Sequence, residues 1–213
     1  MNNNLAKIRN EYTLQGLEEH EIATNPISQF DKWFNEVITS EITESNAMVL
    51  STAFNNRPSS RVVLLKGYDE NGFVFFTNYH SDKGQQIAAN SQVSLNFFWK
   101  ELERQVRIEG IAVKVSESES DEYFQERPIG SQFGAWASNQ SETIANRQVI
   151  EDKLLDLKLQ YGEGPVPRPS HWGGYRVVPT LIEFWQGRAS RLHDRIVYLK
   201  DSDSHWNIKR LSP

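Results

Sequence analysis

The hydrophobic and polar positions of this 213-residue chain follow two different periods, one near the start and another through most of the rest. In residues 28–42, apolar side chains recur three and four positions apart, which is the spacing of one face of an α-helix. Ser28 is the expected N-cap, because a serine oxygen can accept a hydrogen bond from an otherwise unpaired amide of the first turn. From residue 47 onwards the apolar stretches are short and bounded by turn residues, which predicts strands.

The predicted strands are joined mainly by tight connections, with a few helices between them. Residues 69–72, Asp-Glu-Asn-Gly, are typical of a hairpin turn. Strands are expected at 47–54, 61–68, 73–78, 92–99, 104–115, 175–179, 181–186, 192–200 and 205–210, and shorter helices at 81–90, about 120–127 and 146–161. Hairpin-linked strands with peripheral helices indicate the α+β class, mainly β, as an antiparallel barrel or sandwich.

Four segments carry more specific local predictions. In residues 105–109, polar and apolar side chains alternate, as expected for a strand with one buried face. The charged run 116–122 is interpreted as a solvated turn that leads into a helix, and residues 172–175, Trp-Gly-Gly-Tyr, as a tight turn. Residues 162–169 hold three prolines and are expected to form a loop that ends the preceding helix.

Composition excludes several classes of site. The chain has no cysteine, which excludes disulfides, thiolate nucleophiles and cysteine-ligated metals, and its five histidines lack metal-ligand spacing, so no metal site is expected. No apolar stretch approaches the ~20 residues of a membrane helix, and the first residues lack the apolar core of a secretory signal. We therefore expect a cytoplasmic protein without a membrane partner. A net charge of −5 makes nucleic acid an unlikely partner, because binding it needs a surplus of Lys and Arg.

The first candidate site is a row of basic residues. On the strand predicted at 192–200 and its start, Arg191, His193 and Arg195 point to one face, each ~6.6 Å from the next. Such a row repels itself unless an anion or an electron-rich ring lies opposite. The simpler interpretation is a solvated strand face, with His193 as a structural residue. The aromatic surface of the neighbouring segment 183–187 favours a ligand.

The second candidate is a group spaced four residues apart, Tyr123, Arg127 and Ser131, which would share one face of a continuous helix. Pro128 interrupts that helix, because it disfavours helical angles at Arg127 and suits the first turn of a new helix. Free amides of that turn, together with the three side chains, would form a phosphate cradle. The alternative is a surface helix end with an isolated arginine.

The third candidate is the segment 61–66, an apolar run with a cation at each end. Arg61 and Lys66 are ~17 Å apart at the rise of a strand, too far to hold one phosphate together. They could serve two phosphates, or simply cap a buried strand. Nearby, Ser81 is the expected N-cap of a helix with Lys83 in its first turn, which makes a second phosphate site.

Taken together, these segments resemble the pyridoxamine 5′-phosphate oxidase family, from about residue 9 to the end of the chain. The most specific matching pieces are residues 61–66, 102–106, 140–141, 170–174, 183–187 and 191–195. The resemblance implies an antiparallel FMN-binding split β-barrel with peripheral helices, and a homodimer with FMN at the subunit interface. It also implies two parts, residues 1–45 as an N-terminal helical segment and lid, and residues 46–213 as one split-barrel domain.

The resemblance also implies the residues of the site. For FMN these are Arg61, Val62, Val63, Leu64, Leu65, Lys66, Phe76, Thr77, Lys83, Gln105, Gln140, Ser141, Trp185 and Arg195. For the substrate they are Arg9, Tyr12, Lys66, Tyr123, Arg127, Ser131, Arg191, Leu192 and His193, of which Arg191 and His193 are the catalytic pair.

The implied reaction is the FMN-dependent oxidation of pyridoxamine 5′-phosphate or pyridoxine 5′-phosphate to pyridoxal 5′-phosphate. Dioxygen is the acceptor, hydrogen peroxide is formed, and the amine substrate also releases ammonia. The alternatives are another split-barrel flavin oxidoreductase, such as a flavin reductase or a phenazine-pathway oxidase, a non-catalytic flavin or vitamin B6 binding protein, and a nucleic-acid-binding barrel. The last would need a basic groove that this composition provides poorly.

The chain departs from the family pattern at one position. Residues 81–83 read Ser-Asp-Lys, where many relatives read Ser-Arg-Lys. A carboxylate near the cofactor phosphate removes an attraction, so Asp82 is not expected to be a ligand. Because Arg61 and Lys83 remain, we expect weaker FMN retention and not loss of function.

Overall fold

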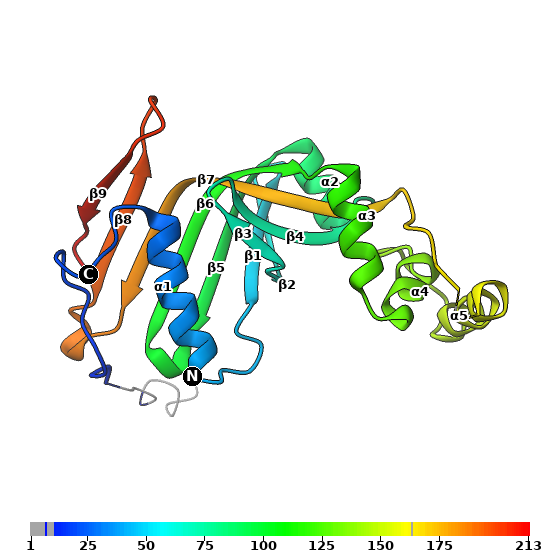
Figure 1. The fold of residues 1–213 in the computed structure, drawn as a ribbon, viewed down its shortest axis with the longest axis horizontal. Helices are drawn as coiled ribbons and strands as arrows, with labels where there is room; N and C mark the ends of the chain where they lie inside the picture. Colours follow the sequence, from blue (N-terminus) through cyan, green and yellow to red (C-terminus); the bar gives the residue numbers. More distant parts are fainter. Residues whose placement is uncertain (1–6, 8–10, 163) are drawn as a thin grey trace. The chain divides into compact units, whose positions relative to one another are not determined.

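The computed structural model describes residues 7, 11–162 and 164–213 (Figure 1). Its helices are α1 (Pro26–Thr39), α2 (Asp82–Ala89), α3 (Glu117–Glu126), α4 (Ile129–Ala137) and α5 (Gln148–Tyr161). Its strands are β1 (Ala47–Phe54), β2 (Arg57–Leu64), β3 (Gly67–Asp69), β4 (Gly72–Asn78), β5 (Gln92–Trp99), β6 (Arg104–Lys114), β7 (Trp172–Gln186), β8 (Asp194–Lys200) and β9 (Trp206–Arg210). Short 3₁₀ turns also cover Lys100–Leu102 and Ala189–Arg191.

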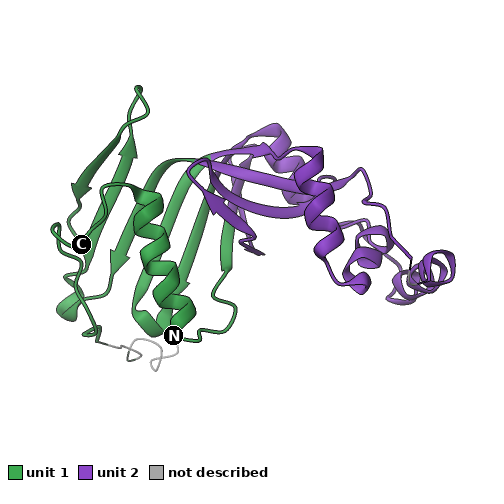
Figure 2. Cartoon of the chain, viewed as in Figure 1, with its two compact units in different colours: residues 1–50, 94–110, 179–213 green, residues 51–93, 111–178 purple. Residues whose placement is uncertain are grey.

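The chain divides into two compact units (Figure 2). Unit 1 consists of residues 1–50, 94–110 and 179–213, and unit 2 of residues 51–93 and 111–178. The strands β1, β5, β6 and β7 each contribute residues to both units. The strand order is β2-β1-β5-β6-β7-β4-β3, and β8 continues the pairing from β7 to β9.

In unit 1, helix α1 supplies an aromatic face to the core. Trp33 packs edge-on against Phe184 of β7, with ring centroids 5.2 Å apart, and Phe30 lies 5.3 Å from Phe97 of β5. The predicted N-cap at Ser28 was wrong. Asn25 caps the helix instead, because its side-chain oxygen accepts hydrogen bonds from the amides of residues 27 and 28, and a proline follows it at the first helical position.

In unit 2, helices α3, α4 and α5 surround a small core of Phe124, Phe133, Val166 and Trp172. Helix α3 begins at residue 117, so the interpretation of residues 116–122 as a solvated turn was wrong. The serine at 116 caps the helix and two glutamates stand in its first turn, where the helix dipole favours negative charge.

The strand predictions were confirmed in most places. Strands β1 and β5 have the predicted bounds, and the alternation in residues 105–109 places every second side chain of β6 in the core. The predicted tight turn at residues 172–175 was wrong, because these residues begin β7. Gly173 and Gly174 permit this close packing, since a Cβ atom would lie 2.1 Å from the Tyr79 hydroxyl in one case and 2.6 Å from Val115 in the other.

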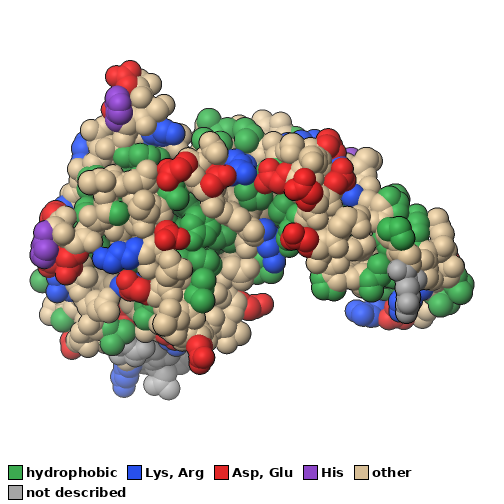
Figure 3. Space-filling view, in the orientation of Figure 1, with side chains coloured by type: hydrophobic (Ala, Val, Ile, Leu, Met, Phe, Trp, Pro, Cys, Tyr) green, Lys and Arg blue, Asp and Glu red, His purple; other side chains and the backbone are tan. Residues whose placement is uncertain are grey.

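No helix among the described residues is long and apolar enough to span a membrane. On the face drawn in Figure 3, acidic and basic side chains are interspersed.

Candidate functional site

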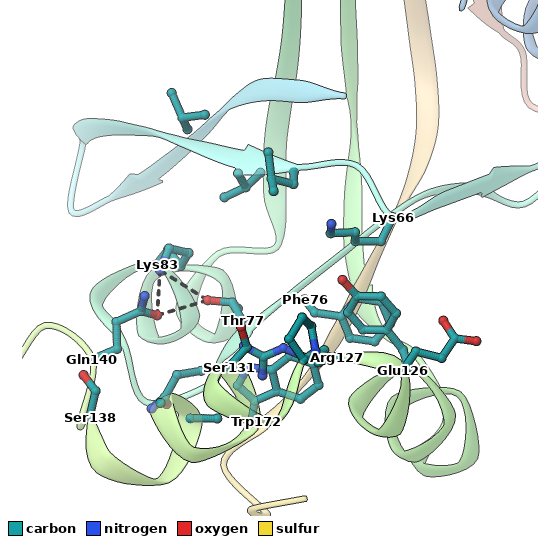
Figure 4. Close-up of a pocket in the computed structure, with 18 residues that line it drawn as sticks. Lys66, Phe76, Thr77, Lys83, Glu126, Arg127, Ser131, Ser138, Gln140 and Trp172 are labelled. Atoms are coloured by element: carbon teal, nitrogen blue, oxygen red, sulfur yellow. Dashed lines mark hydrogen bonds between the residues drawn. The ribbon is translucent and has the colours of Figure 1, made fainter. Parts of the chain in front are cut away.

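A cavity of about 740 Å³ lies within unit 2 (Figure 4). This volume falls in the range of cofactor and substrate pockets. The residues that line it come from β2 and the segment after it, β4, the start of α2, the α3–α4 region with the segment after α4, and the start of β7. They are Val62, Val63, Leu64, Lys66, Phe76, Thr77, Asn78, Lys83, Tyr123, Glu126, Arg127, Pro128, Ser131, Gly134, Ala135, Ser138, Gln140 and Trp172.

Arg127 stands at the break between α3 and α4 and faces this cavity. Its backbone is extended (φ −70°, ψ 144°), because Pro128 follows it and begins the next helix as its N-cap. The guanidinium lies 4.5 Å from the centre of the Trp172 ring, and Glu126 points away from it in Figure 4. Its Nη1 is buried and has no hydrogen-bond partner among the described residues. A buried donor of this kind is expected to find an acceptor in a ligand.

The rest of the predicted phosphate cradle surrounds the same cavity. Tyr123 and Ser131 line it together with Arg127, as their spacing predicted, and Lys66 enters from the segment after β2. The Tyr123 ring stacks on Phe76 at 4.1 Å, and the Lys66 ammonium lies 5.9 Å from the Tyr123 ring. Burial lowers the pKa of Arg127 from its ordinary value, since desolvation penalises a charge without an anionic partner.

A second cation, Lys83, enters the cavity from the first turn of α2. Its ammonium donates to Gln140 Oε1 at 3.0 Å and to Thr77 Oγ1 at 3.2 Å (Figure 4). Ser81 caps α2 as predicted, and its hydroxyl also accepts from Lys83. Burial and the nearby Arg61 lower the pKa of Lys83, whereas the carboxylate at residue 82 raises it.

Arg61 is close to this end of the cavity but is not among its lining residues. Its guanidinium donates to Gln86 Oε1 of α2 at 3.0 Å, and to Thr52 and Ser59 at 2.8 and 2.7 Å. Burial lowers its pKa, and Asp82 opposes that effect. The predicted residue Ser141 lies beside the same turn, where its hydroxyl accepts from the Asp82 amide.

Segment 61–66 is not a buried strand closed by two cations. Strand β2 ends at Leu64, Val62 is 66% exposed, and Leu65 alone of the apolar run is buried. The apolar residues 62–64 therefore present a surface that lines the cavity. This result removes the purely structural interpretation of the run.

In unit 1, the predicted row of basic residues does not exist. Strand β8 begins at Asp194, so Arg191 and His193 precede it, and Arg191 adopts a left-handed backbone (φ 62°) in the 3₁₀ turn. Leu192 is 68% exposed. Strand alternation therefore does not apply to residues 191–193, because β8 pairs with β7 only from residue 194 onwards.

Tyr12, Trp185 and His193 form an aromatic cluster in unit 1. The Trp185 and His193 rings are 4.6 Å apart, and Tyr12 lies 5.8 Å from each. Gly187 permits this arrangement, because a Cβ atom there would lie 2.7 Å from Tyr12. Arg9, the other residue predicted for the lid, lies outside the described residues.

Arg195 is paired with a carboxylate in this structure. Its Nε donates to Glu183 Oε1 at 2.7 Å, and the side chain of Glu183 is only 3% exposed. Gln105, also predicted for the site, stands half-buried on β6. The repulsion expected between Arg195 and its basic neighbours is thus relieved by the protein itself.

His193 is expected to be a neutral imidazole with its proton on Nε2. Its Nδ1 lies 3.1 Å from the Arg188 amide, which is a donor, so Nδ1 must accept. Burial and Arg191 lower its pKa below the ordinary 6.5, and Asp194 partly opposes this. Because the folded protein resists protonation, the stability contributed by His193 is present above pH 6.5 and is lost as the pH falls towards its lowered pKa.

Nitrogen-15 NMR of histidine-labelled protein tests this prediction, with His193→Gln to assign the resonances. At pH 7, Nδ1 should show the shift of an unprotonated acceptor, and the titration midpoint should fall below 6.5. A protonated Nδ1 at neutral pH would contradict the assignment.

Sequence reasoning missed Trp172, whose ring supports Arg127, and Glu183, which holds Arg195. Both lie in segments that resemble the family, 170–174 and 183–187, so the signal was present. The sequence did not show which residue each of them contacts, because neither contact joins residues that are neighbours in the sequence.

Family models and individual relatives match this chain along most of its length, and their names refer to the same kind of enzyme. Residues 34–161 match the family model described as pyridoxamine 5′-phosphate oxidase, and residues 172–213 match that described as the pyridoxine 5′-phosphate oxidase C-terminal dimerisation region. The chain is 54% identical over 214 residues to a pyridoxine/pyridoxamine 5′-phosphate oxidase of Trichormus variabilis, with 100% of both chains covered. It is 56% identical over 211 residues to the protein of that name from Paraburkholderia phytofirmans, covering 98% of this chain and 99% of the relative.

Two solved structures share the fold. PhzG from Burkholderia lata, in complex with tetrahydrophenazine-1-carboxylic acid, matches with a TM-score of 0.89 at 29% identity and covers 96% of this chain and 100% of its own. A pyridoxamine 5′-phosphate oxidase-related, FMN binding protein from Nostoc punctiforme matches with a TM-score of 0.70 at 14% identity, covering 86% of this chain and 97% of its own. The predicted fold class, a mainly antiparallel split β-barrel with peripheral helices, is confirmed.

The family model spans more than half of the chain, and the full-length relatives share more than half of its residues. The chain therefore belongs to the pyridoxamine 5′-phosphate oxidase family.

Proposed function

We propose that this protein oxidises pyridoxamine 5′-phosphate and pyridoxine 5′-phosphate to pyridoxal 5′-phosphate, with FMN as cofactor and dioxygen as acceptor. The observation that carries the proposal is a cavity lined by two separate groups of cationic side chains. One group contains Lys83 and the other contains Arg127. A cofactor and a substrate that each bring one phosphate would satisfy both. Relatives that carry this activity in their names match the chain over its full length.

The residues present fit FMN. The first turn of α2 brings the Lys83 ammonium, the Ser81 hydroxyl and the nearby Arg61 guanidinium to one place, which suits the cofactor phosphate. Lys83 there bonds only to neutral oxygens among the described residues, so its charge is left for an anion. The apolar residues 62–64 of β2, of which Val62 and Leu64 are exposed and Val63 is half-buried, offer a surface for a flat ring.

At the other group, Lys66, Tyr123, Arg127 and Ser131 would hold the substrate phosphate. Arg127 Nη1 has the unfilled donor that such a phosphate requires, and Trp172 fixes the guanidinium plane. Four groups on one phosphate fix the orientation of the attached ring, which converts a collision into an oriented encounter.

When bound, FMN would supply the redox chemistry, the uptake of a hydride from the C4′ carbon of the substrate and the transfer of both electrons to dioxygen, which gives hydrogen peroxide. The protein contributes position and charge. In our proposal, the Arg191 guanidinium and the His193 Nε2–H donate hydrogen bonds to the electron-rich substituents of the substrate ring. His193 is then a donor and not a base, since its Nδ1 is already bonded to the Arg188 amide.

We further propose that the homodimer indicated by the C-terminal dimerisation region holds FMN at its subunit interface. In the assembled dimer, Gln105, Trp185 and Arg195 would contact the cofactor. The proposed activity is that of a pyridoxal 5′-phosphate synthase.

The direct experiment incubates purified protein with FMN, pyridoxamine 5′-phosphate and air, and follows aldehyde and peroxide together. Equal amounts of both are expected. A non-catalytic vitamin B6 or flavin binding protein would bind ligand and form neither product. A phenazine-pathway oxidase would form peroxide with a reduced phenazine substrate and no aldehyde from pyridoxamine 5′-phosphate.

Asp82, at which the chain departs from the family pattern, should weaken FMN binding. It is exposed in the first turn of α2 and close enough to raise the pKa values of both Lys83 and Arg61. Replacing Asp82 with Asn should therefore tighten FMN binding about threefold at low salt, the size expected for one screened surface charge. Fluorescence titration of FMN with apoprotein measures this, with the exposed Asp156→Asn as the control. Unchanged affinity at low salt would show that Asp82 does not act on the cofactor.

A further inference from the structure

Glu183 is a buried carboxylate shared by two arginines of unit 1. Its Oε1 accepts from Arg195 Nε and its Oε2 accepts from Arg107 Nη2, both at 2.7 Å, and its side chain is 3% exposed. A carboxylate so far from water needs full compensation, and two guanidinium groups provide it. No proposed ligand contact involves Glu183 or Arg107.

These residues share one face of the sheet with three of the residues proposed for FMN. Trp185 pairs with Arg195 across β7 and β8, and Glu183 lies two residues before Trp185, so alternation places Glu183 and Trp185 on the same face. Arg107 reaches Glu183 from β6, and Gln105 lies two residues before Arg107. The carboxylate is therefore in the same row as three proposed cofactor residues.

Among the described residues, the contacts of Arg195 leave one of its nitrogens free. Nε is bonded to Glu183, and Nη1 donates to the backbone carbonyl of Ser212 at 3.1 Å. Within the described part of the chain, Nη2 has no hydrogen-bond partner. Since the guanidinium is planar and rigid, two fixed nitrogens determine where the third one points. The hydrogen bond that Arg195 donates to Glu183 also raises the pKa of Arg195.

We propose that Glu183 is the positioning residue for Arg195. It holds the guanidinium so that its free nitrogen donates to bound FMN, while Arg107 occupies the second carboxylate oxygen and balances the charge. Glu183 acts only through Arg195. This inference rests on the proposed function, because it requires Arg195 to contact the cofactor.

The test is the affinity of the apoprotein for FMN, measured by quenching of flavin fluorescence. Glu183→Gln keeps the shape but can accept from one arginine only, and turns an NH₂ group towards the other. We expect it to weaken FMN binding about tenfold, within the range of measured couplings between contacting groups. The matched control is Glu109→Gln on the same strand as Arg107. Glu109 lies 3.7 Å from Arg107 Nη1 and makes no ion pair with Arg195, so its removal should leave the affinity unchanged.

A double-mutant cycle separates positioning from a general structural role. Arg195→Gln should also weaken FMN binding and shift the visible absorption band of the bound flavin, and Glu183→Gln should shift the band in the same direction. In the Arg195→Gln background, Glu183→Gln should cause no further loss. Additive losses, or a loss in Glu183→Gln without the spectral shift, would overturn the proposal.

Two other outcomes are distinguishable. If Arg195→Gln leaves FMN affinity intact, the proposed role of Arg195 in the cofactor site fails first. If Arg195→Gln weakens binding and a folded Glu183→Gln does not, the positioning role alone is wrong. Should Glu183→Gln not fold, the pair Arg107→Gln with Glu183→Gln restores the charge balance. Compared with Arg107→Gln alone, that pair should show the same tenfold loss.

Discussion

Replacing Arg127 with Met should raise KM for pyridoxamine 5′-phosphate about 100-fold and leave kcat within a few fold. A phosphate held by a desolvated arginine loses a charge-assisted contact, about 3 kcal/mol, in the ground and transition states alike. Methionine has a similar length but lacks the guanidinium that lies over the Trp172 ring. Steady-state kinetics of the FMN-saturated enzyme measures the two constants separately.

The same substitution should not destabilise the apoprotein. Arg127 Nη1 is buried without a partner in the described structure, and burying an unpaired polar group has a free-energy penalty. The loss of the cation–π contact with Trp172 offsets part of the gain, so we expect a free energy of unfolding equal to or above that of the parent chain. Arg147→Met, at the exposed N-cap position of α5, is the control for loss of an arginine. If KM of Arg127→Met were unchanged, Arg127 would not be a ligand of the substrate phosphate.

Replacing Arg191 with Met should lower kcat about 100-fold while the affinity for FMN stays the same, the result for a group that acts mainly in the transition state. Arg191 is exposed and lies outside β8, so its side chain does not support the sheet. Stopped-flow reduction of bound FMN by substrate, together with fluorescence titration of the cofactor, separates the two quantities. A decrease in FMN affinity as large as the decrease in kcat would contradict the catalytic role of Arg191.

The left-handed backbone of Arg191 supplies a control for that experiment. At φ 62°, a residue with a Cβ atom carries strain of about 1 kcal/mol, which glycine does not. Arg191→Gly should therefore lose the same activity as Arg191→Met and unfold at an equal or higher temperature. If the glycine variant kept its activity, the guanidinium would not be the group that acts on the substrate.

The sequence predicted most elements of this fold because their signals are local. Alternation in residues 105–109 and the hairpin at 69–72 depend on neighbours in the chain, and both were confirmed. The grouping of Tyr123, Arg127 and Ser131 around one cavity was predictable for the same reason. Pro128 sets the backbone of Arg127 through covalent geometry, so the break between two helices is written in adjacent residues.

Errors arose where a residue's partner is distant in the sequence. Alternation alone placed Arg191 and His193 on a strand, but β8 begins only where β7 offers a pairing partner, at Asp194. The row of cations seemed to require a ligand, yet Glu183 on β7 already neutralises Arg195. The bare sequence could not decide whether segment 61–66 is buried, since its apolar residues suit both a core and a ligand-facing surface.

By itself, the sequence determined the class of fold, the family and the identity of the basic and aromatic groups available for chemistry. The tertiary structure alone decided which of those groups lack a protein partner. Arg127 retains an unpaired donor and Lys83 bonds only to neutral oxygens in the described structure, while Arg195 is held by a carboxylate. The physical reason is that contacts between segments far apart in the chain decide which charges are compensated, so Arg127 and Lys83 keep a net attraction for an anion while Arg195, balanced by Glu183, offers a directed hydrogen bond.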